Sequence, residues 1–240
     1  MATTVSVTTG GGDMALSEVE PEGVPRAAVI VLQEAFGVNA HIEDVTRRFA
    51  GAGYRAVAPH LFHRSGDPVL DYGNFEKIMP HMQALTEAGL LEDLDVTLAY
   101  LADAGFPASG VGVVGFCMGG SVTFLAAARR ALGAAVTFYG GGVGEGRFGM
   151  PPLVEMAPGL ETPWLGLFGD ADQGIPVEQV EALRAAAATA PVPTEIVRYA
   201  GAGHGFHCDA RPDSYHEQAA LDGWQRTLDW FGRYLGSPAA

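Results

Sequence analysis

The stretch Gly115-Phe116-Cys117-Met118-Gly119-Gly120 decides how the chain around it folds. The apolar, β-branched run 111–114 precedes it and is short enough to be a buried strand. The segment 121–132 follows it, with apolar residues at helical spacing and few helix breakers. Glycines two residues before and two residues after Cys117 allow a tight turn where any Cβ would clash. The pattern therefore predicts a strand, a sharp turn and a helix, with one reactive thiol at the tip of the turn.

Such a turn is typical of a nucleophile elbow, with cysteine where serine usually stands. The helix that follows directs its N-terminal N–H groups and the positive end of its dipole toward the thiol. Both features favour a thiolate in the resting protein and an oxyanion in a transition state. The alternative interpretation is a glycine-rich connection in which Cys117 is only a small buried hydrophobe.

Length and composition predict a single α/β domain spanning residues 1–240. No apolar stretch approaches the ~18 residues that a membrane span needs. The first residues lack the basic and apolar regions of a secretory signal, so we expect a cytoplasmic protein. The two cysteines, Cys117 and Cys208, are too few for a disulfide scaffold and are expected as reduced thiols.

The formal net charge of −14 argues against nucleic acid and anionic membrane surfaces as partners, because both attract basic patches. An anionic small molecule is still compatible with this charge, since salt screens distant charges beyond about 8 Å. One arginine in a pocket can therefore bind a carboxylate. We expect a small-molecule substrate and a monomeric protein.

Hydrophobic patterning predicts strands that alternate with helices. The alternation in 3–9 and 14–19, around a glycine turn, predicts an antiparallel hairpin at a sheet edge. The remaining strands are expected at 27–32, 54–58, 111–114, 134–139, 164–168 and 194–199, and the helices at 41–52, 90–104, 121–132, 177–188 and 213–234. This order predicts a mostly parallel sheet with helices on both faces. The segment 60–80 has no regular pattern and is a candidate cover for a site.

Side chains suited to acyl transfer follow four of the expected strands: Glu34, Cys117, the pair Asp170 and Asp172, and His204. Ligands bind at the carboxyl ends of strands in such sheets. The order nucleophile, acid, histidine is that of the α/β-hydrolases. In this chemistry a thiolate attacks a carbonyl, the histidine takes and returns a proton, and a carboxylate orients the imidazole.

Simpler interpretations exist for each of these side chains. Either aspartate can cap the helix that follows, and His204 can be an ordinary loop histidine. Glu34 is harder to explain in that way, because a buried acid needs a partner. Asp172 lies further out in its loop than Asp170, so we favour Asp172 and keep Asp170 as the alternative. Neither a metal nor another cofactor is expected, because the histidine spacing and the glycines at 140–142 match no metal or dinucleotide motif.

Several segments together resemble the dienelactone hydrolases, also called carboxymethylenebutenolidases. The resemblance extends from about Ala27 to the final helix and implies an α/β-hydrolase fold with a Cys117–His204–Asp172 triad. The segments are Gln33-Glu34-Ala35-Phe36-Gly37-Val38-Asn39, the Cys117 elbow, Gly169-Asp170-Ala171-Asp172 with Ile175-Pro176, and Ala202-Gly203-His204-Gly205-Phe206.

The resemblance also implies roles around the thiol. Glu34 is expected to interact with the Cys117 thiol in the resting enzyme, and substrate binding is expected to displace it and leave a thiolate. The oxyanion hole maps onto the backbone N–H groups of Ala35 and Met118.

Two arginines bind the substrate carboxylate in the family. One matches Arg64, whereas the position of the other is occupied by Cys208, which cannot carry that charge. His207 and Arg211 are nearby residues that can compensate. The substrate-binding residues expected in this chain are Arg64, Phe36 and Tyr139.

The resemblance implies hydrolysis of small lactones or esters, with 4-carboxymethylenebut-2-en-4-olide opened to maleylacetate as the first reaction to test. The alternative within enzymes is a broader carboxylesterase or thioesterase in which Arg64 plays no part. The alternative from another class is a non-catalytic redox-sensing domain that uses Cys117 and Cys208 as a thiol pair.

Overall fold

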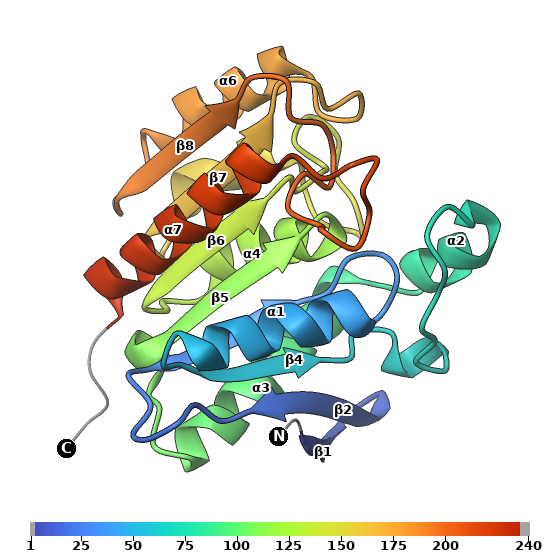
Figure 1. Ribbon diagram of the computed structural model, residues 1–240, viewed down its shortest axis with the longest axis vertical. Coiled ribbons are helices and arrows are strands. Elements are labelled where there is room, and N and C mark those ends of the chain that lie inside the picture. Colours follow the sequence, from blue (N-terminus) through green and yellow to red (C-terminus); the bar gives the residue numbers. More distant parts are fainter. Residues whose placement is uncertain (1–2, 236–240) are drawn as a thin grey trace.

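One β-sheet with helices on both faces forms the framework of the molecule (Figure 1). The structure is a computed structural model that describes residues 3–235, apart from the side chain of Phe75. The strands are β1 (Thr3–Thr9), β2 (Gly12–Val19), β3 (Ala28–Leu32), β4 (Arg55–Pro59), β5 (Val111–Phe116), β6 (Ala134–Phe138), β7 (Trp164–Gly169) and β8 (Thr194–Tyr199). The α-helices are α1 (Ala40–Gly51), α2 (Phe75–Gln83), α3 (Glu87–Asp103), α4 (Met118–Arg129), α5 (Leu153–Met156), α6 (Val177–Ala187) and α7 (Glu217–Tyr234), and the short 3₁₀ turns are η1 (His63–Ser65), η2 (Ala108–Gly110) and η3 (Ala157–Gly159).

Within the described residues the sheet has the strand order β1-β2-β4-β3-β5-β6-β7-β8. The hairpin β1–β2 is antiparallel, and β2 joins β4 in the antiparallel sense as well. Every other neighbouring pair is parallel. The predicted fold class, with its N-terminal antiparallel hairpin at one edge, is therefore confirmed.

The central strands are covered on both faces. Helices α1 and α7 lie in front of the sheet in Figure 1, and α3 and α4 lie behind it. Every residue of β3, β5, β6 and β7 is buried, as expected for parallel strands between two helical layers. The carboxyl ends of these strands consequently meet at one edge, where the loops carry the candidate site.

The segment 60–80 is more regular than its sequence pattern predicts. It contains η1, and α2 begins within it at Phe75, where Asn74 caps the helix by accepting a hydrogen bond from the backbone N–H of Lys77. Pro80 lies inside α2. Figure 1 shows α2 standing away from the sheet, and the helix is anchored by Ile78, which is buried in the hydrophobic core.

The last helix begins later than the sequence pattern predicts. α7 starts at Glu217 instead of residue 213, because His216 caps it by accepting a hydrogen bond from the N–H of Ala219. The residues before it form the long loop 200–216, which carries His204 and Arg211. Among the helices within residues 3–235, none has the length and apolar character needed to cross a membrane.

Candidate active site

Cys117 stands alone between β5 and α4, in a strained backbone conformation. Its φ is 55° and its ψ is −113°, in a region that side chains with a Cβ rarely adopt. Such strain costs on the order of 1–3 kcal/mol and persists only where the surrounding structure enforces it. The thiol is partly exposed and not in a disulfide. The sequence prediction of a sharp turn with an accessible thiol at its tip agrees with this geometry.

The glycines around Cys117 are needed because backbone segments cross without space for side chains. A Cβ on Gly115 would lie 2.1 Å from the carbonyl oxygen of Gly119. A Cβ on Gly119 would lie 2.4 Å from the carbonyl oxygen of Leu32, at the end of β3. These contacts involve backbone atoms and cannot be relieved by rotating a side chain. The turn therefore brings the start of α4 directly against the end of β3.

His204 and Asp172 form a hydrogen-bonded pair in the loops after β8 and β7. The Nδ1 atom of His204 donates to Oδ2 of Asp172 over 2.7 Å. The Asp172 side chain is buried, and its Oδ1 accepts a hydrogen bond of 2.8 Å from the N–H of Gly174. Asp170 instead pairs with Arg198 through two hydrogen bonds of 2.7 and 3.0 Å. The tertiary structure thus joins Asp172, and not Asp170, to the histidine.

The surroundings of His204 favour its protonated form. Burial lowers the pKa of His204, but the charge of Cys117 and the hydrogen bonds to Asp172 and Cys117 outweigh burial and raise the pKa to about 10. A protonated imidazole near a thiol favours the thiolate form of that thiol.

Glu34 is fully buried and is paired with Arg211. The Nη2 atom of Arg211 donates to Oε1 of Glu34 over 2.6 Å, while Oε2 has no hydrogen-bond partner among the described residues. Burial raises the pKa of Glu34, and the nearby Arg211, His204 and Tyr139 partly offset that rise. Among the described residues no hydrogen bond joins Glu34 to the Cys117 thiol, although the resemblance predicts an interaction between them. The physical reason is that the guanidinium compensates the buried carboxylate directly.

Two aromatic rings hold Arg211 in place. Its guanidinium carbon lies 5.4 Å from the ring centre of Phe36 and 4.9 Å from that of Tyr72. The hydroxyl of Tyr72 is 3.6 Å from the Sγ atom of Cys208, which is buried. Tyr72 belongs to the segment 60–80, and no sequence motif singled it out. Only the path of that segment over the site brings Tyr72 to the Glu34–Arg211 pair.

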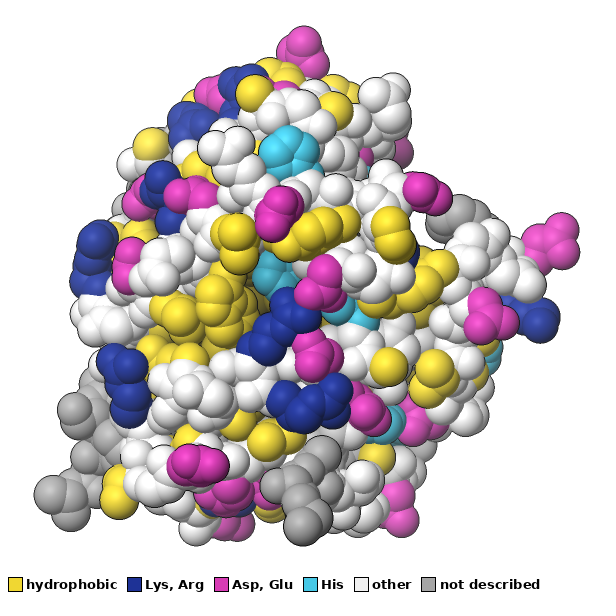
Figure 2. Space-filling model, in the orientation of Figure 1, with side chains coloured by type: hydrophobic (Ala, Val, Ile, Leu, Met, Phe, Trp, Pro, Cys, Tyr) yellow, Lys and Arg dark blue, Asp and Glu magenta, His cyan; other side chains and the backbone are white. Residues whose placement is uncertain are grey.

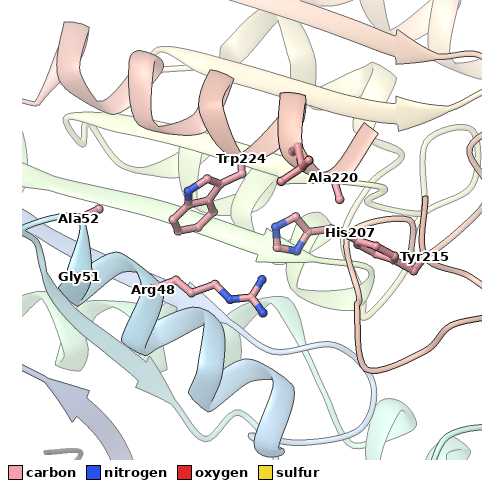
Figure 3. Close-up of a pocket in the computed structure, with 8 residues that line it drawn as sticks. Arg48, Gly51, Ala52, His207, Tyr215, Ala220 and Trp224 are labelled. Atoms are coloured by element: carbon pink, nitrogen blue, oxygen red, sulfur yellow. The ribbon is translucent and has the colours of Figure 1, made fainter. Parts of the chain in front are cut away.

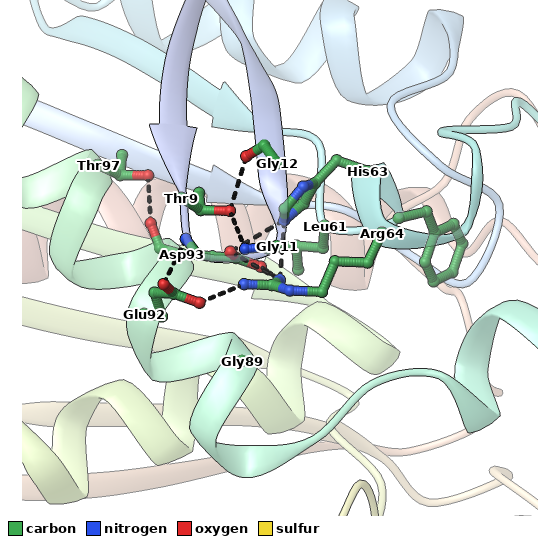
Figure 4. A network of polar contacts seen from close by, with 12 residues as sticks. Thr9, Gly11, Gly12, Leu61, His63, Arg64, Gly89, Glu92, Asp93 and Thr97 are labelled. Carbon is green, nitrogen blue, oxygen red and sulfur yellow. Dashed lines mark hydrogen bonds and ion pairs between the residues drawn. The ribbon is translucent and has the colours of Figure 1, made fainter.

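Arg64 is not beside Glu34, contrary to the expectation that it helps bind the substrate. Its Nη1 atom donates to both carboxylate oxygens of Asp93 over 2.8 Å, and its Nη2 atom donates to Glu92 over 2.6 Å. A Cβ on Gly11 would lie 2.3 Å from Nε of Arg64, so the hairpin turn packs on the guanidinium. Figure 4 shows Arg64 lying beside Gly11 of the β1–β2 turn and hydrogen-bonded to Glu92 and Asp93 of α3. The buried carboxylate of Asp93 needs a cation, and Arg64 supplies it.

The remaining predicted residues lie around the same strand ends. Tyr139 follows β6 with a φ of 39°, and its buried ring packs 5.1 Å from the ring centre of His204. Its hydroxyl has no hydrogen-bond partner among residues 3–235, and burial together with Glu34 raises its pKa well above the ordinary value. Met118 is the first residue of α4, so its N–H has no partner within the helix. No hydrogen bond from the N–H of Ala35 occurs within the described part of the chain.

His207 packs against the rings of Phe116 and Phe138, with ring centres 5.0 and 4.9 Å apart. Hydrophobic side chains gather in the hollow between α1 and α7 (Figure 2), where a cavity of about 470 Å³ opens. His207, Arg48 and Trp224 line this cavity, as Figure 3 shows. Burial lowers the pKa of His207 to about 3, so it is neutral and cannot replace an arginine. Arg211 is therefore the one of the two suggested residues that brings a positive charge to Glu34.

No metal centre is formed within residues 3–235, where no three His, Cys, Asp or Glu side chains come together as ligands. The open, mostly parallel sheet and the strained turn between its strand β5 and the following helix place the protein among the α/β-hydrolases. The chain matches the model of the dienelactone hydrolase family over residues 15–235 and belongs to that family. It is accordingly a carboxylic-ester hydrolase.

Individual relatives support the assignment. A protein of Salmonella typhimurium, provisionally named as a carboxymethylenebutenolidase, is 42% identical over 236 residues, which are 96% of this chain and 87% of the relative. The carboxymethylenebutenolidase of Rhodococcus opacus is 32% identical over 210 residues, covering 86% of this chain and 81% of the relative. A crystal structure from Klebsiella pneumoniae, provisionally named as a dienelactone hydrolase, superposes with a TM-score of 0.90 at 40% identity and covers 98% of this chain and 99% of that chain.

Proposed function

We propose that the protein hydrolyses small carboxylated lactones and esters with Cys117 as the nucleophile, His204 as the proton carrier and Asp172 as the residue that orients the imidazole. The observation that carries the proposal is the strained Cys117 at the start of α4, combined with the 2.7 Å hydrogen bond between His204 and Asp172. Glycine would adopt this conformation without strain, so a cysteine here has no structural advantage. A nucleophile explains the strained residue, because the sharp turn exposes its side chain.

The reaction follows from this geometry. The thiolate of Cys117 attacks the carbonyl carbon and forms a tetrahedral intermediate, whose oxyanion accepts hydrogen bonds from the N–H groups of Ala35 and Met118. His204 gives its proton to the departing oxygen, and an acyl-thioester remains on the sulfur. Water then attacks the thioester while His204 accepts the water proton, and the acid product leaves with the Cys117 thiolate and the protonated His204 restored.

Arg211 is the residue that we propose to bind the substrate carboxylate. It lies beside Glu34, its Nε has no hydrogen-bond partner among the described residues, and Phe36 and Tyr72 hold the guanidinium in position. A carboxylated substrate that pairs with Arg211 competes with Glu34 for the same cation. Glu34 would then be released toward the active-site interior, where an anion favours the protonated state of His204. The first substrate to test remains 4-carboxymethylenebut-2-en-4-olide.

The test compares anionic with neutral esters in matched arginine variants. Arg211→Gln should lower kcat/KM for the carboxylated lactone by roughly 30-fold, which corresponds to about 2 kcal/mol for one charge-assisted contact. It should leave kcat/KM for p-nitrophenyl acetate within about threefold of the wild type. Arg64→Gln is the control, and its selectivity between the two substrates should not change. A selectivity loss in Arg64→Gln but not in Arg211→Gln would overturn the assignment.

A broader carboxylesterase or thioesterase that does not act on dienelactone is the second candidate. Arg64 is paired with Glu92 and Asp93, so Arg211, beside Glu34, is the cation that remains for a substrate carboxylate. One such arginine instead of two favours an enzyme with broader specificity. Turnover of neutral esters or thioesters, without turnover of the carboxylated lactone, would establish it.

The redox-sensing alternative requires Cys117 and Cys208 to form a disulfide. Cys208 is buried against Tyr72, and burial raises the pKa of its thiol, so it is a poor partner for exchange. Failure of oxidant to form a reversible intramolecular disulfide would exclude this alternative.

We also propose that the enzyme acts as a cytoplasmic monomer without a cofactor. Light scattering and turnover after chelation test the monomer and the cofactor independence.

A further inference from the structure

A second chain of nucleophile, histidine and aspartate lies between β2 and the segment that follows β4. The Oγ atom of Ser17 and Nε2 of His60 are 2.9 Å apart, and Nδ1 of His60 and Oδ2 of Asp67 are 2.7 Å apart. The second distance equals that between His204 and Asp172. All three residues lie outside the site described above.

The tautomer of His60 follows from its partners. An ionised carboxylate only accepts hydrogen bonds, so Nδ1 of His60 carries the proton that is donated to Asp67. In the neutral imidazole Nε2 is then unprotonated and accepts the hydrogen bond from the Ser17 hydroxyl. This is the arrangement in which an imidazole can remove a serine proton.

The backbone holds Asp67 in position. Gly66 has a φ of 95° and Asp67 a φ of 51°, so two successive residues adopt left-handed conformations. The N–H of Asp67 donates to the carbonyl of Phe62 over 3.0 Å. His60 is anchored through its own N–H, which donates to Ala15 in β2 over 2.9 Å. The aspartate and the histidine are therefore both fixed relative to the strand that carries Ser17.

Small reagents can reach the three side chains. The side chain of His60 is 15% exposed and that of Asp67 is 34% exposed, and Ser17 is partly exposed. In a second serine–histidine pair, Ser65 and His81, no carboxylate is hydrogen-bonded to the histidine among the described residues. Nδ1 of His81 lies 2.8 Å from Oγ of Ser65, which also donates to the carbonyl of Phe62. Ser65 is therefore a natural reference for an unactivated serine.

We propose that Ser17 is a second acyl-accepting site, which takes an acyl group from activated aryl esters with His60 as the base and Asp67 as the orienting acid. Ser17 Oγ forms a bond to the acyl carbon while its proton moves to Nε2 of His60, and the bond to the aryl oxide breaks. The aryl oxide leaves with the electron pair, and His60 then releases its proton to the aryl oxide or to water. The protein carries an O-acylserine at the end of the step.

The acyl group is expected to remain on Ser17 rather than to turn over. Ser17 lies in an extended strand paired on both sides, with Thr4 of β1 and Ala58 of β4, so its own N–H belongs to the sheet. It therefore lacks the free amide of a helix N-terminus, and such a donor is worth roughly 10²–10³-fold in rate. This makes Ser17 a modification site and distinguishes it from Cys117. The inference goes beyond the proposed function and does not depend on it.

The experiment uses the full-length Cys117→Ala protein, in which the thiol cannot consume the ester. The protein is incubated with p-nitrophenyl acetate, quenched in acid, and the acetylation rate of each peptide is measured by mass spectrometry. Lys77 is the only lysine in the sequence and provides an internal standard for general reactivity. Ser17 should acetylate at least 10-fold faster than Ser65.

The histidine and aspartate variants test the cause. Loss of the general base in His60→Gln should slow Ser17 acetylation roughly 100-fold, within the range that general bases contribute. Asp67→Asn changes a partly exposed side chain, so the fold should be retained, and acetylation of Ser17 should slow about 10-fold. His81→Gln is the matched control and should leave the Ser17 rate unchanged.

The proposal is overturned if Ser17 is not acetylated, if it reacts no faster than Ser65, or if Asp67→Asn and His60→Gln leave its rate unchanged. Circular dichroism of each variant separates a folding defect from loss of the base. Because ester turnover by Cys117 is measured in the wild type and Ser17 acetylation in Cys117→Ala, each hypothesis can fail without the other.

Discussion

Two histidine–aspartate pairs in this molecule each stand next to a nucleophilic side chain, and the elements that carry the two nucleophiles differ. His204 and Asp172 follow the carboxyl ends of β8 and β7, and the charge of Cys117 on its strained turn raises the pKa of His204. His60 and Asp67 follow β4 and meet a serine in the middle of the extended strand β2. The histidine–aspartate distance is 2.7 Å in both pairs, so the hydrogen bond itself does not distinguish them.

The difference lies in the backbone around the nucleophile. Cys117 precedes a helix whose first N–H groups are free, so charge that develops on a substrate oxygen has donors nearby. Ser17 is flanked by paired strands that use its backbone groups. A nucleophile, a base and an acid therefore occur together in two places, and we expect turnover only where the glycine-flanked turn adds free N–H donors.

Removing each nucleophile should separate the two sites most clearly. Cys117→Ala should lower kcat for ester hydrolysis by at least about 10³-fold, because no thioester can form. Ser17→Ala should keep kcat within about twofold of the wild type, since Ser17 is not expected to turn over. Steady-state kinetics on p-nitrophenyl acetate measure both. Retention of a tenth of the activity in Cys117→Ala would remove this cysteine from the mechanism.

Replacing the aspartate of each histidine–aspartate pair should also separate the two sites. Asp172→Asn leaves the His204 imidazole without a partner that fixes its tautomer, so kcat should fall about 100-fold. Asp67→Asn should leave kcat unchanged and affect only the acetylation of Ser17. Both variants are compared at one pH with one ester. Equal losses of kcat in the two variants would show that the second pair supports the first.

The turn around Cys117 should resist a single added methyl group. Gly119→Ala places a Cβ against the carbonyl of Leu32 and should destabilise the protein by at least about 2 kcal/mol. Gly51→Ala is the control, because no atom within 4 Å would meet its Cβ. At the end of α1 this change should be neutral or stabilising by up to about 1 kcal/mol. Urea denaturation gives both values, and a Gly119→Ala variant as stable as the wild type would contradict the crowded turn.

The protonation of His204 should depend on its thiol partner. Burial lowers its pKa, and the charge of Cys117 is the largest of the effects that raise it to about 10. Cys117→Ala should therefore lower the pKa of His204 by at least one unit, or about 1.4 kcal/mol. The sign follows because removing a negative neighbour makes the imidazolium less favourable. NMR titration of the ring protons measures the shift, and an unchanged pKa would show that His204 is not coupled to the sulfur.

Much of the fold could be predicted, because each element has its own local signal. The apolar run of β5, the glycines around Cys117 and the alternation of β1 and β2 are all visible in the chain. Helix α2 was missed because its signal is a cap at Asn74 followed by a short helix with an internal proline. Such a segment has little periodicity to detect.

The site was less predictable than the fold, since its contacts join loops that are distant in sequence. Arg64 stands where a resemblance predicts a substrate arginine, yet the buried Asp93 holds it against α3. Arg211 takes the place beside Glu34, 177 residues away along the chain. Which cation compensates a buried carboxylate depends on the approach of the chains in space and leaves no local pattern.

The sequence alone determined the elements whose cause is local. A cysteine between glycines at a strand–helix junction has few backbone conformations available. The sharp turn and its place at the carboxyl end of the strand therefore follow from residues 111–132. The tertiary structure decided which charges meet. In the folded protein His204 pairs with Asp172, while Asp170 pairs with Arg198. Glu34 pairs with Arg211 and not with Arg64. Ser17 lies beside His60, which pairs with Asp67. Electrostatic partners are set by distances in the packed molecule, and packing is a property of the whole chain.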